Sequence, residues 1–194
     1  MKLEDAVRIL SEKIDLLLQT KSSVIIALDG CSASGKTTLS YVLQRIYIEQ
    51  SNLFHVDDYF LRPEQRTPAR YEEVGGNIDY ERFEKEVLIP ISKGQSVYTS
   101  RFNCATMSLE EPRVLPFLPI NIVEGSYALH PKFQNYYDFS AFIRIPQDIQ
   151  QKRIYSRNPE TKEMFFTKWI PLEEKYFSKT AIETRATLVI KIEN

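Results

Sequence analysis

The first fifty residues combine two kinds of hydrophobic pattern. Apolar residues separated by charged ones recur at alternating steps of four and three, at Leu3, Val7, Leu10, Ile14 and Leu17. This spacing predicts an amphipathic helix that packs on the core of its own domain, with a short coiled coil as the alternative. The apolar run VIIAL at 24–28 is rich in β-branched residues and predicts a strand buried on both faces, as in a parallel sheet. A second amphipathic helix is predicted over 38–50.

Short apolar runs and helical patterns alternate along the rest of the chain. Strands are predicted at 52–56, 120–123, 141–145 and 186–192, and helices at 79–88, 147–156 and 172–184. This order predicts an α/β fold with a parallel sheet. The polar stretch 62–77, rich in Pro and Gly, is expected to form a long functional loop, and three prolines exclude a helix interior from 112–119. The chain is expected to form one domain over 1–194.

The stretch LDGCSASGKTTLS at 28–40 carries the strongest chemical signal. It fits the pattern G-x4-G-K-S/T and lies between the predicted strand and the predicted helix. Glycines let consecutive backbone N–H groups turn toward phosphate oxygens, and the start of the helix adds its positive dipole end to the same anion. Lys36 supplies a mobile cation for the outer phosphates, and the Thr37 hydroxyl can ligate Mg²⁺. The sequence therefore predicts a nucleoside-triphosphate site formed by Gly30, Ser32, Ala33, Ser34, Gly35, Lys36, Thr37 and Thr38.

Composition narrows the partners of such a site. Hydrophobic residues make up 43% of the chain and charged residues 26%, the proportions of an ordinary globular protein. The 25 basic and 26 acidic residues nearly cancel, so no overall positive field would attract nucleic acid or an anionic membrane surface. Two distant cysteines, Cys31 and Cys104, and a charged start without a signal peptide favour a cytoplasmic protein without disulfides.

Carboxylates follow two of the predicted strands. Asp57 and Asp58 come at the end of FHVDDYFL, where open α/β sheets bind their ligands. A carboxylate there can orient and deprotonate an attacking hydroxyl, although an Asp in this place can also cap a turn. Glu124 ends another strand, in NIVEG, and is suited to hold Mg²⁺, with a structural ion pair as the alternative.

The helix predicted from residue 147 carries a pair of cations. Arg153 and Arg157 are four residues apart and therefore share a helix face. Two guanidinium groups can neutralise a phosphoryl group during its transfer, whereas a solvated basic face is the alternative. Asn158 and Pro159 end this helix and suggest a hinge, so residues 147–170 are predicted to form a small lid.

Taken together, these motifs resemble the uridine kinase and phosphoribulokinase family of P-loop small-molecule kinases. DGCSASGKTTL is similar to the P-loop of the family, HVDDYFL to its segment with the general base, GGNIDYERFEKEV to its N-F/Y-D segment and VEGSYAL to its E-G strand end. RIYSRNPET resembles the family's lid, and ATLVIKIEN resembles its closing strand. The resemblance covers most of the chain. It implies a P-loop NTPase fold with three layers in α/β/α order, a parallel central sheet and a small helical lid.

The resemblance also implies roles for single residues. Asp57 matches the family's general base, and Glu124 matches a residue linked to Mg²⁺ and to substrate. Asp79 matches the Asp that contacts sugar hydroxyls, although it could instead cap the helix that follows it.

Two departures from the family pattern concern the acceptor. Glu81 stands where the family segment has Pro, and SRFNCATMSLEEP has Asn103 and no His where nucleoside kinases read the base. Tyr59 and Arg101 are candidates for acceptor contacts, with a place in the core and in solvent, respectively, as their alternatives.

We therefore expect an enzyme that uses Mg²⁺ and moves the γ-phosphoryl group of ATP (or GTP) to a hydroxyl group of a small metabolite. A nucleoside is the first expectation for this acceptor, as in uridine kinase. A non-nucleoside acceptor of the pantothenate or sugar-phosphate type is the alternative, and so is a nucleotide-binding regulator without acceptor chemistry. The predicted catalytic residues are Lys36, Asp57, Arg153 and Arg157. Homo-oligomers are common among such proteins, and the sequence leaves the oligomeric state open.

Overall fold

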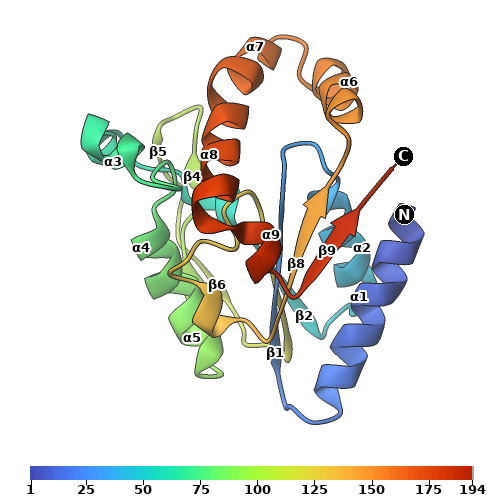
Figure 1. Cartoon of the computed structure of the whole chain (residues 1–194). Coiled ribbons are helices and arrows are strands. Elements are labelled where there is room, and N and C mark those ends of the chain that lie inside the picture. The colour runs from blue at the N-terminus through green and yellow to red at the C-terminus, as the bar shows by residue number, and fades with distance from the viewer. Residues whose placement is uncertain (194) are drawn as a thin grey trace.

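Five parallel strands form the centre of the computed structural model, which describes residues 1–193 (Figure 1). Their order across the sheet is β2-β7-β1-β8-β9. The strands are β1 (Val24–Gly30), β2 (Ser51–His55), β7 (Ile120–Glu124), β8 (Phe139–Arg144) and β9 (Leu188–Lys191). All seven residues of β1 are buried, as its continuous apolar run predicts for a central strand covered on both faces. The predicted α/β fold with a parallel central sheet is confirmed.

Helices cover both faces of this sheet and complete three layers (Figure 1). On one face lie α1 (Leu3–Leu18) and α2 (Lys36–Ile46), and Leu10 and Ile14 of α1 belong to the core, as its amphipathic spacing predicts. On the other face α8 (Ile170–Thr180) packs against β8, where the rings of Phe177 and Phe142 meet edge to face. The remaining helices are α3 (Pro68–Glu72), α4 (Tyr80–Phe83), α5 (Ile89–Ser92), α6 (Gln147–Arg157), α7 (Lys162–Met164) and α9 (Ile182–Arg185).

Two of the helical segments contain a wide turn just before a proline. Residues 80–92 comprise α4, the π-helical turn η3 (Glu84–Leu88) and α5, and residues 162–180 comprise α7, the π-helical turn η5 (Phe165–Trp169) and α8. Proline follows each turn two positions later. Because proline lacks an N–H and crowds the carbonyl four residues earlier, the wider turn lets each helix continue past it. The helix predicted over 79–88 therefore extends to residue 92.

Backbone geometry explains the other differences from the predicted elements. The helix predicted over 38–50 ends at residue 46, and Glu49 adopts a left-handed backbone (φ +65°) as the chain turns into β2. The helix predicted over 172–184 is divided by Ala181, which is also left-handed (φ +49°), into α8 and α9. The predicted loop 62–77 contains the short helices η2 (Pro63–Gln65) and α3.

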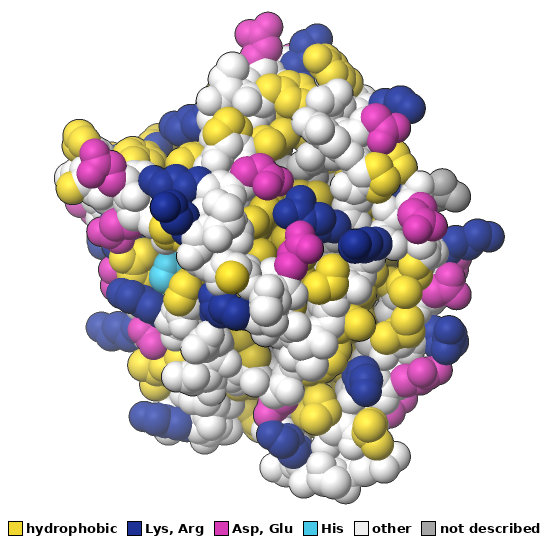
Figure 2. Space-filling model, viewed as in Figure 1, with side chains coloured by type: hydrophobic (Ala, Val, Ile, Leu, Met, Phe, Trp, Pro, Cys, Tyr) yellow, Lys and Arg dark blue, Asp and Glu magenta, His cyan; other side chains and the backbone are white. Residues whose placement is uncertain are grey.

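Short antiparallel strands lie outside the central sheet. They are β3 (Val97–Thr99) paired with β6 (Arg113–Leu115), and β4 (Phe102–Asn103) paired with β5 (Ser108–Leu109). Lys and Arg side chains are interspersed with Asp and Glu over the face shown in Figure 2. Within residues 1–193, no helix has the length and apolar character needed to cross a membrane.

The carboxyl edge of the sheet gathers the predicted functional segments. β1, β7 and β2 lie in register there, so that Glu124 pairs with Leu28 on one side and with His55 on the other. Beyond the same edge the chain leaves β8, passes through α6, α7 and α8, and returns through α9 to β9 (Figure 1). The predicted lid, 147–170, thus lies beyond the carboxyl ends of the strands.

Candidate active site

The loop between β1 and α2 depends on two glycines. A Cβ on Gly30 would lie 2.2 Å from the backbone oxygen of Ile143, so only glycine allows β1 and β8 to approach this closely. Gly35 has φ +96° and is the N-cap residue of α2, a conformation that other residues rarely adopt. The loop wraps one end of a cavity of about 510 Å³, which residues 32–38 line. The first N–H groups of α2 therefore open toward this cavity, as an anion site at a helix start requires.

Two polar side chains of the loop lack strong partners. Lys36 is 7% exposed, and among residues 1–193 its Nζ donates a hydrogen bond only to the backbone oxygen of Cys31, at 3.4 Å. The buried hydroxyl of Ser34 has no hydrogen-bond partner among residues 1–193. A buried cation and a buried hydroxyl without partners are costly unless a ligand satisfies them. The loop therefore fits the phosphate oxygens of a nucleoside triphosphate.

Thr37 and Glu124 form the oxygen pair expected for Mg²⁺. The Thr37 hydroxyl lies 3.3 and 3.2 Å from the two carboxylate oxygens of Glu124, which is 3% exposed. On the other side, Nδ1 of His55 is 2.5 Å from the same carboxylate. Burial tends to lower the pKa of His55, but the hydrogen bond and the charge of Glu124 outweigh it, so the pKa is raised.

Thr37 and Glu124 offer too few oxygens to hold Mg²⁺ alone, so the ion would also need oxygens from a bound phosphate. No group of three or more His, Cys, Asp and Glu side chains within 1–193 could hold a metal ion. Mg²⁺ in phosphoryl-transfer sites commonly takes one or two protein oxygens and completes its shell with phosphate oxygens and water. Thr37 and Glu124 match that pattern.

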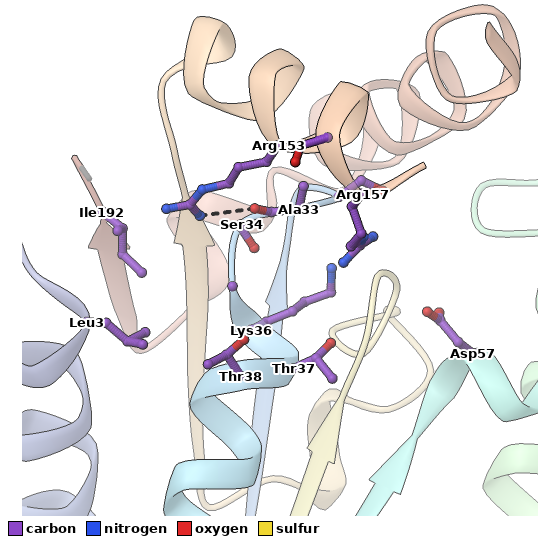
Figure 3. A pocket seen from close by; sticks show the side chains of 13 residues that line it. Leu3, Ala33, Ser34, Lys36, Thr37, Thr38, Asp57, Arg153, Arg157 and Ile192 are labelled. Atoms are coloured by element: carbon purple, nitrogen blue, oxygen red, sulfur yellow. Dashed lines mark hydrogen bonds between the residues drawn. The ribbon is translucent and has the colours of Figure 1, made fainter. Parts of the chain in front are cut away.

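Asp57 faces the phosphate loop across the cavity. Figure 3 shows its carboxylate, the Lys36 ammonium and the Arg157 guanidinium directed into the same space. Water reaches Asp57 through the cleft, yet protein surrounds its other sides. The loss of hydration on those sides is the largest effect on the pKa of Asp57, and it raises the pKa to about 6. The nearby positive charge of Lys36 acts in the opposite direction and lowers the pKa. Asp57 is thus placed as a proton acceptor beside a phosphate site.

Asp58 has a different environment from its neighbour. Its carboxylate forms an ion pair with Arg101 at 2.9 Å, and Arg113 lies 3.8 Å away. Asp58 does not line the cavity that the phosphate loop and Asp57 share. Of the two adjacent carboxylates, Asp57 is therefore the one that a bound phosphate and an acceptor could both approach.

The two predicted lid arginines reach the cavity from α6, Arg153 over the phosphate loop and Arg157 on the side toward Asp57 (Figure 3). Nη1 of Arg153 donates a hydrogen bond to the backbone oxygen of Ala33, at 3.1 Å (Figure 3). Arg157 is exposed, and its Nε donates to the side chain of Asn158. Both line the cavity. Arg153 thus ties α6 to the loop, and Arg157 remains available to a bound anion.

Three other predicted acceptor residues lie apart from this group. Tyr59 is buried in the core, and its hydroxyl is hydrogen-bonded to Thr99. Asp79 is 2% exposed and caps α4 by accepting from the backbone N–H of Arg82 at 3.1 Å. Arg101 is held by Asp58. None of the three lines the cavities that Asp57 lines.

A buried carboxylate that the sequence analysis missed supports the phosphate loop from α8. Glu173 is 4% exposed and accepts hydrogen bonds from the backbone N–H and the hydroxyl of Ser32, at 2.9 and 2.5 Å. It also accepts from the hydroxyl of Ser126, at 2.8 Å. The only available signal was an acidic residue on the apolar face of a predicted helix, which does not reveal its partners.

A second contact from α8 lies one turn further along the helix. The Tyr176 hydroxyl donates to the buried carboxylate of Asp29, at 2.8 Å. Asp29 also accepts from the N–H groups of Gly30 and Leu129, at 2.6 and 2.8 Å. Burial is the largest cause that raises the pKa of Asp29 to about 6. α8 therefore holds both ends of the turn that leaves β1.

Asp57 also lines a smaller cavity on the side away from the phosphate loop. This cavity has a volume of about 160 Å³ and lies beneath η5 and α8. Its lining combines polar and aromatic side chains, among them Asn77, Ser126, Phe60 and Trp169. A small acceptor could therefore enter on this side of Asp57 while phosphates lie on the other.

Comparisons with known proteins establish the fold. No protein-family model matches the chain, and no curated protein sequence matches it. Among solved structures, it is similar to a possible uridine kinase from Bacillus stearothermophilus, with a TM-score of 0.74 and 21% identity over 98% of this chain and 100% of that one. The chain shares the three-layer α/β/α fold of that structure, with its P-loop after the first strand.

Two further structures share this fold. One is a candidate fructose transport system kinase from Silicibacter sp. TM1040, with a TM-score of 0.68 and 18% identity over 97% of this chain and 98% of that one. The other is D-glycerate 3-kinase from Cryptococcus neoformans, with a TM-score of 0.63 and 12% identity over 89% of this chain and 87% of that one. At these identities the likeness establishes the fold, and the acceptor of each protein remains a property of that protein.

Proposed function

We propose that this protein is a P-loop kinase that transfers the γ-phosphoryl group of ATP or GTP to a hydroxyl group of a small metabolite. One observation carries the proposal: Asp57 lines both the cavity of the phosphate loop and the smaller cavity beside it. A general base must reach the acceptor hydroxyl while that hydroxyl faces the γ-phosphate. A site that only binds nucleotide has no need of a carboxylate in this position.

In the proposed reaction, the acceptor oxygen forms a bond to the γ-phosphorus as the bond from that phosphorus to the β–γ bridging oxygen breaks. The hydroxyl proton passes to a carboxylate oxygen of Asp57, and the nucleoside diphosphate leaves with the bridging oxygen. Lys36, Arg153 and Arg157 line the same cavity and would offset negative charge on the transferring group. Mg²⁺, held by Thr37 and Glu124, would supply positive charge at the outer phosphates.

A nucleoside acceptor, with a reaction like that of uridine kinase, is the finer form of the proposal. It is supported by the motif resemblance and by the aromatic rings of Phe60 and Trp169 beside Asp57, since flat rings can stack on a base. The burial of Asp79, the residue expected at the sugar hydroxyls, does not add support. A hydroxy acid or a sugar phosphate is the competing acceptor.

The test compares two adjacent carboxylates. Release of ADP by the purified full chain is measured with MgATP and a panel of nucleosides, hydroxy acids and sugar phosphates. With the best acceptor, Asp57→Asn should lower kcat by about 100-fold or more, because the amide cannot take the proton. Asp58→Asn, which removes an ion pair outside the cavity, should lower kcat by less than about tenfold.

Two outcomes would contradict the proposal. If Asp57→Asn and Asp58→Asn lowered kcat equally, Asp57 would not be the general base. Binding of ATP without ADP release for any acceptor would instead favour the nucleotide-binding regulator.

A further inference from the structure

A cavity of about 240 Å³ continues from the smaller cavity beside Asp57. The two share the side chains of Phe60, Asn77 and Trp169 as lining, so they form one path that leads away from the phosphate loop. The far part is mostly apolar and is closed by the loop 62–77 on one side and by the lid on the other. A molecule whose hydroxyl lies at Asp57 would extend its other end into this far cavity.

Two cations line the far cavity from opposite sides. Arg66 comes from the loop after η2, where its Nε donates to the backbone oxygen of Leu61 at 3.0 Å. Lys168 comes from η5, and its Nζ lies 4.8 Å from the ring of Trp169 and 5.4 Å from the ring of Tyr71. No acidic side chain lines this cavity.

Arg66 is half-buried and Lys168 is exposed, and their surroundings differ from those of the half-buried Arg70 and Arg82. Arg70 and Arg82 each form ion pairs with two carboxylates. Arg66 and Lys168, in contrast, have no Asp or Glu oxygen within 4.0 Å among residues 1–193. A cation on an apolar wall without a carboxylate partner favours an anion, since charge-assisted hydrogen bonds are among the stronger polar contacts.

We propose that the far cavity is an anion subsite of the acceptor, so that the substrate is a hydroxyl compound with a carboxylate or phosphate at its other end rather than a neutral nucleoside. The proposal rests on the function proposed above, because Asp57 fixes the hydroxyl end. The body of the acceptor would lie along the side chains of Phe60 and Trp169, which line both cavities. An anion bound between Arg66 and Lys168 would also join the loop 62–77 to the lid, so that acceptor binding and lid closure are coupled.

The position of Trp169 gives a direct way to measure binding. It is the only tryptophan in the chain and lines both acceptor cavities. The full chain is first saturated with MgADP, which fills the phosphate loop and cannot donate a γ-phosphoryl group. Tryptophan fluorescence is then titrated with matched pairs of probes: pantothenate and pantothenol, D-glycerate and glycerol, and uridine 3′-phosphate and uridine.

In each pair the neutral member has a hydroxyl or hydroxymethyl group where the anionic member has its phosphate or carboxylate, and the other hydroxyl groups are the same. In at least one pair, the anionic member should bind about tenfold or more tightly than the neutral member. A preference in the pantothenate or glycerate pair indicates a carboxylate, and a preference in the uridine pair indicates a phosphate. Arg66→Gln and Lys168→Gln should each reduce this preference, whereas Lys179→Gln, an exposed cation of α8, should leave it unchanged.

Equal binding of both members in every pair, or no fluorescence response to any probe, would overturn the anion subsite. So would a preference that persists in both the Arg66→Gln and the Lys168→Gln variant, because the cations would then only stack on aromatic rings. Binding of the neutral members serves as the check that each variant is folded. Because this test involves no transfer, a protein that binds anions but releases no ADP would refute the proposed kinase and leave the subsite standing.

Discussion

The two halves of the candidate site are built in different ways. The donor half consists of consecutive residues, 30–38, that lie between a central strand and the helix after it. The acceptor half is assembled from side chains of η1 (Val56–Tyr59) and the two residues after it, the loop 62–77, the turn between β4 and β5, the loop after β7 and the segment 157–173. Phosphate can be bound by backbone groups of one short segment, whereas a particular acceptor needs side chains that converge from several segments.

The halves also differ in how firmly the fold holds them. The turn that leaves β1 is fixed by the buried carboxylates of Asp29 and Glu173, both bonded between the loop and α8. The acceptor half has exposed or half-buried liners such as Met164, Lys168 and Trp169 on the lid. The comparison indicates a preformed donor site beside an acceptor site that can adjust, and three experiments test it.

The strongest test of the donor half removes its cation. Lys36→Ala should lower kcat about 100-fold or more, because Lys36 is the buried cation of the phosphate loop. ADP release with a fixed acceptor measures the effect, and circular dichroism checks the fold. Lys179→Ala, on the exposed side of α8, is the control. If the kcat of Lys36→Ala were within threefold of the wild-type value, the loop would have no role in the reaction.

The second test measures how kcat/KM depends on pH, because Asp57 lies where the donor and acceptor halves meet. Asp57 can accept a proton only when ionised, and its pKa is raised to about 6, so kcat/KM for the acceptor should fall about tenfold from pH 7 to pH 5. The charged groups around it are Lys36 of α2, Glu124 of β7, Glu173 of α8 and His55 of β2.

His55 is the other group in this set that can titrate near neutral pH. Its raised pKa would act above the range of Asp57. The fall in kcat/KM centred near pH 6 should therefore persist in His55→Gln and disappear from the residual activity of Asp57→Asn. A profile that is flat between pH 5 and 7 in the wild type would contradict this assignment.

The smallest expected effect concerns the support beneath the donor half. Tyr176→Phe removes one donor to buried Asp29 and should lower the free energy of unfolding by about 1 kcal/mol. Since the pKa of Asp29 is raised to about 6, the loss should be larger at pH 8, where the carboxylate is ionised, than at pH 5. Urea denaturation measures it, with Tyr155→Phe on the exposed face of α6 as the control. An equal loss at both pH values would show that Asp29 keeps one charge state between pH 5 and pH 8, which would contradict a pKa near 6.

This contrast also explains which features the sequence could predict. The sheet and the phosphate loop were predictable, because burial on both faces and the G-x4-G-K-T spacing are local patterns. Asp57 was predictable because a strand end places it at the carboxyl edge. The positions of Tyr59 and Asp79 were not, since packing decides whether such a side chain faces a cavity or the core.

Residues that act across the fold were missed for the same reason. Glu173 and Ser32 are 141 positions apart in sequence, and only the return of α8 along the sheet brings them together. Arg66 of the loop 62–77 and Lys168 of η5 line one cavity, and no local pattern in the sequence predicts that these two segments meet. The wide turns before Pro90 and Pro171 likewise depend on packing that holds the helix together.

The connection between β8 and β9 has a practical consequence. These strands are paired neighbours, and everything between them, residues 145–187, is a single excursion that leaves the sheet and returns to it. Protein engineering could therefore replace residues 145–187 as one segment and change the acceptor while the loop between β1 and α2 stays the same. Any graft would have to retain Glu173 and Tyr176, which anchor the neighbouring turn, and Arg153 and Arg157, which line the phosphate cavity.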